Sequence, residues 1–170
     1  MRISKRLKYI ADMALTISYD QIIDTCCDHG ILSFHLAENL IDSNIIALDI
    51  NPYIIQKLRQ KNTKNTISIL CQDASKLKIQ KQKSLIIISG IGGELAAKII
   101  SGILEINNFF LQIDFIIAPN NKSHLVRNAL NKFSYKSHQE NLVFDKKIGY
   151  EIIYSKYDSG ESFDLIGKRM

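Results

Sequence analysis

The stretch IIDTCCDHGIL, residues 22–32, places two carboxylates, two thiols and an imidazole close together in the chain. Three kinds of site use such side chains: a metal centre, a cysteine nucleophile activated by His29, or a loop that binds a nucleotide-like ligand. Each site makes a different demand on the rest of the sequence. A metal needs further ligands, a nucleophile needs an oxyanion site, and a ligand loop needs a strand before it and a helix after it.

The metal and nucleophile interpretations find no support elsewhere in the chain. A structural zinc site usually takes four ligands from spaced Cys and His pairs, but Cys26 and Cys27 are adjacent and Cys71 is remote. No second motif accompanies His29 to suggest acyl transfer. A disulfide between the adjacent cysteines would be strained. We therefore expect no metal site, and we interpret both cysteines as small, partly buried residues at the end of a strand.

The elements that must position this loop alternate between apolar strands and amphipathic helices. Strands are predicted at residues 20–27, 44–50, 66–73, 83–93 (ending in a glycine loop), 114–121, 135–145 and 149–157, and helices at 3–15, 31–41, 52–62, 94–104 and 123–133. Strands that are apolar throughout, with helices between them, indicate a parallel sheet covered on both faces. The sequence thus predicts an α/β, Rossmann-like fold with a mostly parallel seven-stranded sheet. One domain is expected over residues 1–157, with a basic N-terminal helix within 1–15, followed by a polar, flexible tail over 158–170.

Acidic residues end the first three predicted strands. Asp24 or Asp28 follows the first strand, Asp49 the second and Asp73 the third. Ligands of parallel sheets bind at this edge, near the point where the strand order reverses. A dinucleotide-binding turn would carry Gly-x-Gly-x-x-Gly, whereas this loop has the single Gly30, which disfavours an NAD enzyme. S-adenosylmethionine (SAM) has no pyrophosphate, and the three acids in chain order suit its ammonium group, ribose hydroxyls and adenine amine. Alternatively, Asp73 only caps a helix start.

Five motifs together resemble a known family. They are ISKRLKYIADM at the N-terminus, DTCCDHGIL after the first strand, SGIGGELAAKII after the fourth, IAPNN after the fifth and KKIGYEII in the last hairpin. They span roughly residues 2–155 and are similar to the bacterial tRNA (adenine-N1)-methyltransferases of the TrmK type, which methylate a D-arm adenine at tRNA position 22. The family has Gly-Ser where this chain has Cys26–Cys27. We expect the catalytic fold alone, without the family's C-terminal helical domain, so a self-associated dimer or a partner could replace that domain.

The resemblance implies roles for individual residues. Cofactor contacts are expected from Asp24, Asp28, Gly30, Asp49, Ile50, Asp73, Ala74 and Gly90. Catalytic roles are expected for Asp28, His29 and Asn120. Substrate contacts are expected from Lys5, Arg6, Gly92, Gly93, Asn120, Asn121 and Tyr150, with Lys8, Lys122 and Arg127 as further contacts to tRNA phosphates. Each has a plainer interpretation, such as a sharp turn at the glycines, a helix cap at Asn120 or a solvated basic face.

The composition limits the class of protein. The chain has 170 residues, of which 46% are hydrophobic and 23% charged, so it can bury a substantial core. No window approaches the roughly 20 apolar residues of a membrane span. The use of only 3 cysteines, with no secretory signal, favours the cytoplasm. The net charge of +5 fits ordinary surface lysines or a polyanion such as RNA. The other interpretations are a catalytically degenerate methyltransferase fold that binds RNA or SAM, and a methyltransferase with a non-tRNA substrate.

Overall fold

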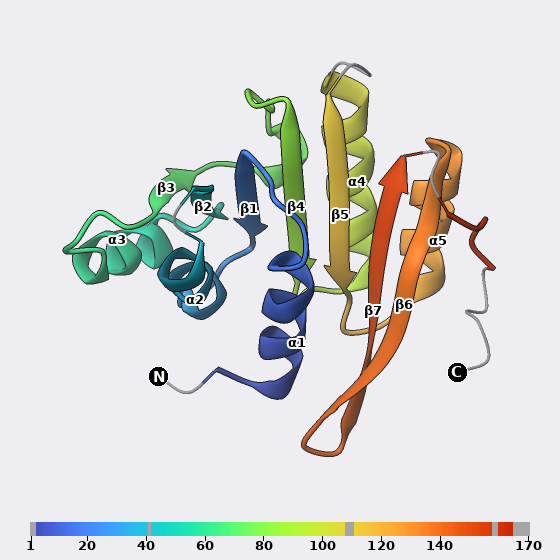
Figure 1. The fold of residues 1–170 in the computed structure, drawn as a ribbon, viewed down its shortest axis with the longest axis horizontal. Coiled ribbons are helices and arrows are strands. Elements are labelled where there is room, and N and C mark those ends of the chain that lie inside the picture. Colours follow the sequence, from blue (N-terminus) through green and yellow to red (C-terminus); the bar gives the residue numbers. More distant parts are fainter. Residues whose placement is uncertain (1–2, 41, 108–110, 158–159, 165–170) are drawn as a thin grey trace.

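The computed structural model describes residues 3–40, 42–107, 111–157 and 160–164, which form one sheet flanked by helices (Figure 1). The strands are β1 (Gln21–Thr25), β2 (Asn44–Asp49), β3 (Ser68–Cys71), β4 (Lys83–Ser89), β5 (Gln112–Ala118), β6 (Tyr135–Asp145) and β7 (Ile148–Tyr157). The helices are α1 (Lys5–Ala14), α2 (Ile31–Asn39), α3 (Pro52–Lys61), α4 (Gly93–Ile106) and α5 (Ser123–Lys132), with a short 3-10 helix η1 (Ala74–Lys76).

The strands form a seven-stranded sheet in the order β3-β2-β1-β4-β5-β7-β6. Strands β1 to β5 are parallel to their neighbours, whereas β7 runs antiparallel to both β5 and β6. The predicted mostly parallel, seven-stranded sheet is therefore confirmed. The chain moves outward from β1 to β2 and β3, then returns to place β4 on the other side of β1. The loops after β1 and β4 consequently meet at the point where the strand order reverses.

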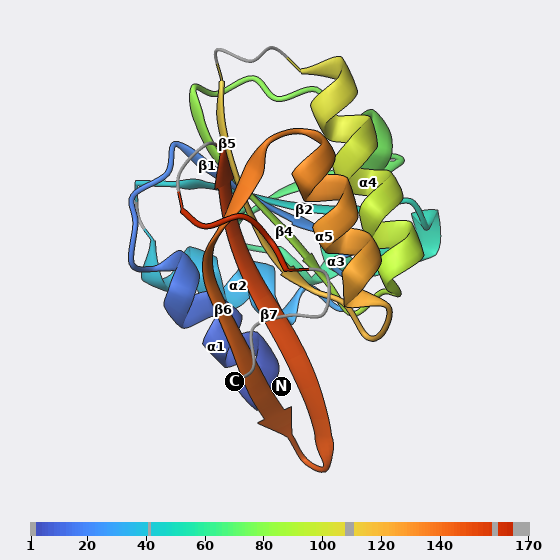
Figure 2. The same ribbon diagram turned by 90° about the vertical axis from the view of Figure 1, so that its right-hand side faces the viewer.

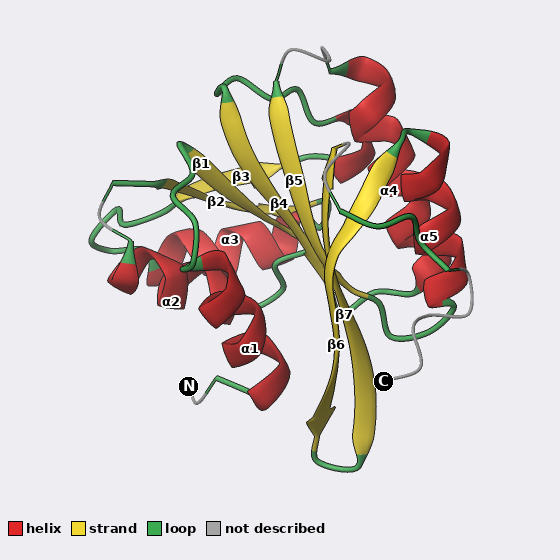
Figure 3. Ribbon diagram, turned by 45° about the vertical axis from the view of Figure 1, so that its right-hand side comes forward, coloured by secondary structure: helices red, strands yellow, loops and turns green. Residues whose placement is uncertain are grey.

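The two faces of the sheet are covered by different helices (Figure 3). Helices α1, α2 and α3 pack on one face, and α4, α5 and η1 on the other. Strand β4 shows why both faces must be covered. Leu85 and Ile87 pack in the core beneath α1, α2 and α3, whereas Ile86 and Ile88 pack in the core beneath α4, α5 and η1. Successive strand residues point to opposite faces, so a strand buried on both sides is apolar throughout.

Side-chain caps fix several helix starts. The Ser4 hydroxyl accepts a hydrogen bond from the backbone N–H of Leu7 at 3.3 Å and caps α1. Asn51 caps α3, and Pro52 occupies the first turn, where its missing N–H costs no hydrogen bond. Asp73 caps η1 through the N–H of Ser75. The plainer interpretation of Asp73 as a cap is therefore confirmed, without excluding a ligand contact.

Several predicted strands end earlier in the structure than in the sequence prediction. The first strand, predicted to residue 27, stops at Thr25 because Cys26 adopts a positive φ of 56°. The fourth, predicted to run into a glycine loop within residues 83–93, stops at Ser89, and the loop begins at Gly90, which has a φ of 80°. The predicted helix at 31–41 ends at residue 39, and residue 41 lies outside the described residues. Left-handed backbone cannot continue a strand, so these turns define where the loops at the carboxyl edge begin.

The segment predicted as a flexible tail differs from that expectation over residues 160–164. Ser137 and Glu161 exchange two backbone hydrogen bonds of 2.7 and 3.0 Å, and Phe163 is only 7% exposed. Phe163 joins the core beneath α4 and α5 because its ring offers a large apolar surface to bury. The rest of the predicted tail, residues 158–159 and 165–170, lies outside the described residues.

Strands β6 and β7 form a hairpin that extends beyond the body of the domain, beside α1 (Figure 2). Strand β5 pairs with β7 only between Ile153 and Ser155, so the hairpin residues before Ile153 in β7 continue past the end of this pairing. Among the described residues, no helix combines the length and hydrophobicity that crossing a membrane requires.

Candidate active site

A cavity of about 350 Å³ opens at the carboxyl ends of β1, β2 and β4. It is lined by Arg6, Leu7, Asp24, Cys26, Cys27, Asp28, His29, Ile31, Leu32, Asp49, Ile54, Ser89, Gly90 and Ile91. Its position is the edge at which parallel α/β sheets bind ligands. Residues of the stretch 22–32 therefore line one side of this cavity, as expected of a loop that binds a ligand.

The β1–α2 loop reaches this shape through three left-handed residues. Cys26, Asp28 and Gly30 have φ values of 56°, 47° and 71°, and the Gly30 N–H donates to the Cys27 carbonyl at 2.8 Å. Gly30 must be glycine for a second reason, since a Cβ there would lie 2.5 Å from Leu58 of α3. Non-glycine residues held at positive φ are strained, and such strain is common in ligand loops. The loop thus coils tightly with one glycine where dinucleotide-binding turns use three.

Two acids from adjacent strands reach the cavity. Asp24 is 2% exposed, and its Oδ2 accepts a hydrogen bond of 2.6 Å from the Ser33 hydroxyl of α2. Burial raises the pKa of Asp24 to about 7, although the Ser33 hydrogen bonds oppose that rise and the negative charge of Asp49 adds to it. Asp49, 9% exposed, accepts the N–H of Asn51 at 2.9 Å. A buried carboxyl with a shifted pKa in a cavity is typical of a functional site.

Asp28 and His29 stand at the mouth of the cavity. Their side chains are 66% and 54% exposed, and His29 Nε2 lies 3.7 Å from Asp28 Oδ1. Both residues line the cavity, as the sequence analysis expected of catalytic candidates. Their exposure leaves them accessible to a substrate that approaches from solvent.

On the opposite wall, Arg6 and Gly90 line the cavity, and they are contacted by two residues from outside its lining, Asn120 and Tyr150. Arg6 of α1 donates from Nη1 to Asn120 Oδ1 at 3.1 Å, and its guanidinium lies 4.4 Å from the ring centroid of Tyr150 in β7. Asn120 donates from Nδ2 to the Gly90 carbonyl at 2.8 Å and from its backbone N–H to Ile91 at 2.8 Å. The Nε of Arg6 is buried and has no hydrogen-bond partner among the described residues. The structure therefore brings Arg6, Asn120, Tyr150 and Gly90 together, as one substrate site would require.

Other predicted site residues lie away from the cavity lining. The Asp73 carboxyl accepts hydrogen bonds from the N–H and hydroxyl of Ser75, and these bonds lower its pKa. Ala74 is buried in the core. Ile50 is 67% exposed. Gly93 donates its N–H to the Asn121 carbonyl.

The glycine turn before α4 is set by close packing. A Cβ on Gly93 would overlap the backbone of Lys122, and one on Gly92 would lie 3.1 Å from Asn121 Oδ1. Close approach of the β4 and β5 loops therefore explains these two glycines.

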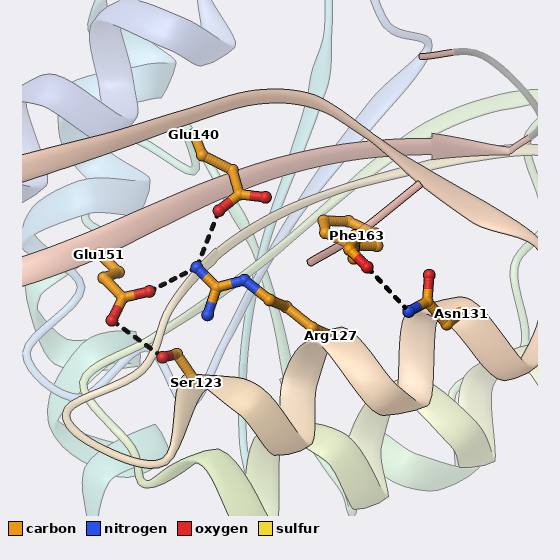
Figure 4. A network of polar contacts seen from close by, with 6 residues as sticks. All are labelled: Ser123, Arg127, Asn131, Glu140, Glu151 and Phe163. Atoms are coloured by element: carbon orange, nitrogen blue, oxygen red, sulfur yellow. Dashed lines mark hydrogen bonds and ion pairs between the residues drawn. The ribbon is translucent and has the colours of Figure 1, made fainter. Parts of the chain in front are cut away.

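The predicted phosphate contact at Arg127 is wrong. Its side chain is 1% exposed and makes ion pairs with Glu140 of β6 and Glu151 of β7 (Figure 4). A guanidinium enclosed in this way cannot reach an RNA backbone. Arg127 neutralises two acids of the hairpin. The local sequence around α5 gives no indication of this pairing.

The remaining basic candidates are exposed. Lys5 is exposed on α1, Lys8 pairs with Asp12 at 3.0 Å, and Lys122 pairs with Glu94. Exposed pairs of this kind contribute little stability and can exchange for a phosphate partner.

Cys26 and Cys27 lie just after β1, where the sequence predicted small, partly buried residues. Cys26 is half-buried and Cys27 buried, and neither forms a disulfide. Burial raises the pKa of Cys26 to about 11 and raises that of Cys27 further, so both remain protonated thiols near neutral pH. Within residues 3–40, 42–107, 111–157 and 160–164, no cluster of three or more His, Cys, Asp and Glu side chains could hold a metal ion.

Sequence reasoning missed some residues of the site. Ser33, the partner of Asp24, lies on α2, and Ser89 and Ile91 line the cavity beside Gly90. Ser33 lies in the first turn of α2, where its hydroxyl faces Asp24 of β1. A serine at this position was the available sequence signal for that contact. Ser89 was visible as the polar end of an otherwise apolar strand.

The sheet order and the cavity at its carboxyl edge define the architecture of class I methyltransferases, which confirms the predicted fold class. A family model described as "Methyltransferase domain" matches residues 3–153. The chain belongs to this methyltransferase family. No curated protein sequence matches it significantly.

Solved structures share the fold at low sequence identity. The m1A22 tRNA methyltransferase TrmK of B. subtilis has a TM-score of 0.80 and 24% identity, over 92% of this chain and 67% of that one. TrmK of M. capricolum, solved with S-adenosyl-homocysteine (SAH), has a TM-score of 0.79 and 19% identity, over 96% and 73%. Magnesium protoporphyrin IX methyltransferase (ChlM) from Synechocystis, with bound SAM, has a TM-score of 0.71 and 15% identity, over 89% and 78%. At such identities the likeness shows the common fold alone.

Proposed function

We propose that the protein transfers a methyl group from SAM to N1 of an adenine in tRNA, at position 22 in the D-arm. One observation carries this proposal: a single cavity has buried acids on one wall and Arg6 and Gly90 on the other, where both residues bond to Asn120 beside the cavity. The first wall suits a cationic cofactor and the second suits a polar base edge. The named TrmK relatives support the choice of adenine N1 and of tRNA. Because tRNA is the proposed substrate, we propose that the protein acts in the cytoplasm.

The residues of the first wall fit SAM. The buried Asp24 carboxyl matches the ammonium group of the methionine part, and Asp49, two residues beyond the register partner of Asp24 in the next strand, matches the ribose hydroxyls. We assign the adenine side of the cofactor to the segments of Ile50 and Asp73–Ala74, which follow β2 and β3. When bound, SAM supplies a methyl group on a sulfonium, which is an electrophile that needs no further activation.

The second wall would orient the substrate. Adenine N1 is a neutral nucleophile with an in-plane lone pair, so holding the ring in line with the methyl group provides most of the acceleration. A paired base must first leave its stack, at a cost of a few kcal/mol. Gly90 and Asn120 offer a carbonyl and an amide to the base edge, and Arg6 and Tyr150 form a flat surface beside them. Asp28 or His29 at the mouth can stabilise the cationic product.

Cofactor affinity is expected to depend on pH through Asp24. Without ligand its pKa is about 7, while an ammonium partner needs the carboxylate. Below pH 7, binding must therefore release a proton from Asp24, and the affinity for SAH should fall by up to about tenfold per pH unit. Above pH 7 this effect levels off. Isothermal titration calorimetry between pH 5.5 and 7.5 measures it.

Two variants test whether Asp24 is the group that titrates. Asp24→Asn should bind SAH weakly and with a flatter pH profile, because its amide does not ionise. Asp12→Asn, on the exposed face of α1, should keep the slope of the unaltered protein. A slope that persists in Asp24→Asn would assign the titration to another group.

The direct test incubates the protein with methyl-labelled SAM and unmodified tRNA, followed by nucleoside chromatography. Label in 1-methyladenosine is expected. Asp49→Ala should weaken cofactor binding by roughly 10- to 100-fold, because it removes charge-assisted hydrogen bonds to the ribose. The label should fall accordingly at low SAM concentration and recover as SAM is raised.

Two other results would change the assignment. SAM binding without label in any RNA would favour a non-tRNA substrate or a missing partner subunit. RNA binding with no SAM binding would favour a degenerate fold, for which the replacement of a glycine by Cys26 in the loop supplies a reason.

A further inference from the structure

The tip of the β6–β7 hairpin exposes large apolar side chains. In this hairpin arm, residues 141–150, Leu142, Phe144 and Ile148 are 43%, 59% and 56% exposed. Figure 2 shows the arm projecting beyond the body of the domain, and within the described part of the chain these three side chains remain exposed. Leu142 and Phe144 lie on one face of the arm and Ile148 on the other, and exposed apolar side chains on a projecting element are characteristic of a contact surface.

The backbone of the arm presents the Phe144 ring on a defined face. Phe144 pairs across the hairpin with Gly149, and Leu142 lies two residues away on the same face. A Cβ at Gly149 would lie 3.3 Å from both side chains, so glycine lets Leu142 and Phe144 rest against the strand. One side of the aromatic ring is thus supported and the other faces solvent.

Positive charge adjoins this ring. The turn that joins the strands contains Lys146 and Lys147, both exposed, with Lys146 at a φ of 59°. Neither lysine makes an ion pair with another described residue. An aromatic ring beside unpaired lysines suits a nucleic acid, since the ring stacks on a base and the ammonium groups attract phosphates. An apolar protein partner would gain nothing from the two charges.

The arm is continuous with the wall of the active site. Tyr150, at its base, points to the α1 side and stacks on Arg6, which in turn bonds to Asn120. Lys147 lies three positions before Tyr150, which is about 10 Å along an extended strand. At about 3.4 Å per nucleotide along a stacked strand, a few nucleotides span this distance. An RNA with its target base at Asn120 would therefore have flanking nucleotides at the turn of the arm, and these nucleotides must cross the turn to reach Phe144, which lies on the face opposite Tyr150.

We propose that the hairpin arm is an RNA-binding element. Phe144 stacks on an unpaired nucleobase, and Lys146 and Lys147 hold the phosphates beside it. This inference rests on the proposed function, because it places the arm next to a target base in the active site. Under this proposal, the catalytic domain itself contributes part of the affinity for tRNA.

The test compares tRNA binding by arm variants and by a charge-matched control. Lys146→Ala/Lys147→Ala should weaken binding and reduce the slope of log affinity against log salt by about 1 for each lost phosphate contact. Phe144→Ala should weaken binding roughly 5- to 100-fold with an unchanged slope, because stacking releases no counterions. Lys78→Ala/Lys81→Ala removes the same charge before β4, at the opposite edge of the sheet, and should have a smaller effect. Fluorescence anisotropy with labelled, unmodified tRNA measures each affinity.

The remaining readouts separate the possible failures. SAH affinity and the unfolding midpoint should be unchanged in all three variants, because the substituted side chains are exposed. Equal tRNA affinity in arm variants and control would overturn the proposal. So would a Phe144→Ala variant that changes a dimer into a monomer by sedimentation while each subunit keeps its tRNA affinity. If the unaltered protein binds tRNA through the arm but yields no 1-methyladenosine, the proposed reaction is wrong, whereas the RNA-binding role of the arm is supported.

Discussion

Replacing Arg127 by methionine is expected to lower the free energy of unfolding by about 3–5 kcal/mol. The guanidinium is 1% exposed and pairs with Glu140, whose side chain is 4% exposed, at 2.8 Å. It also pairs with the partly exposed Glu151. Methionine would fill much of the space but would leave two carboxylates facing each other without a cation. Denaturant unfolding followed by circular dichroism measures the loss.

Two further variants show whether the charges cause this loss. Lys132→Met, on the same helix but 68% exposed, should change stability by less than about 1 kcal/mol. Combining Arg127→Met with Glu140→Gln and Glu151→Gln should recover part of the loss, because the uncompensated charges are then removed. If the triple variant is no more stable than the single one, packing rather than electrostatics dominates at this site.

Replacing Asn120 by alanine is expected to reduce kcat for tRNA methylation by about 100-fold or more, with SAH affinity nearly unchanged. The amide accepts from Arg6 and donates to the Gly90 carbonyl, so its loss separates the two sides of the substrate wall. Misplacing a reacting group by about 1 Å can cost about 100-fold in rate. The proposed cofactor contacts Asp24 and Asp49 keep their hydrogen bonds to Ser33 and Asn51, which do not involve Asn120.

Single-turnover kinetics with saturating SAM and tRNA measures the effect of Asn120→Ala. Asn128→Ala, exposed on the neighbouring helix α5, provides the matched control and should retain the rate of the unaltered protein. A variant that loses SAH affinity in proportion to its rate would show that Asn120 supports the cofactor rather than the substrate.

The sheet was largely predictable because its strands are apolar on both faces. Residues such as Leu85 to Ile88 leave no polar face, and only a covered parallel strand accommodates them. The acids at strand ends were predictable for the same reason, since Asp24 and Asp49 interrupt apolar runs at the edge where such strands meet. Strand boundaries were less accurate because the left-handed turn at Cys26 carries no glycine signal.

The contacts between distant segments could not be predicted. Arg6 and Asn120 are 114 positions apart, and nothing near either residue indicates that they share a hydrogen bond. Arg127 was misassigned for the same reason, since its partners lie 13 and 24 positions away on the hairpin. A basic residue on a helix has the same local sequence whether it faces solvent or a buried acid. Tertiary burial alone decides between them.

The two walls of the cavity come from different stages of synthesis. The acids of the cofactor wall, Asp24 and Asp49, leave the ribosome with the first third of the chain. The substrate wall needs α1 together with Tyr150 of β7, so it cannot form until nearly the whole domain has emerged. Because domains fold as units during synthesis, neither wall is complete in a nascent chain that stops before Tyr150. The stacking of Arg6 on Tyr150 therefore joins an early and a late part of the domain, and the proposed substrate wall exists only once the fold is complete.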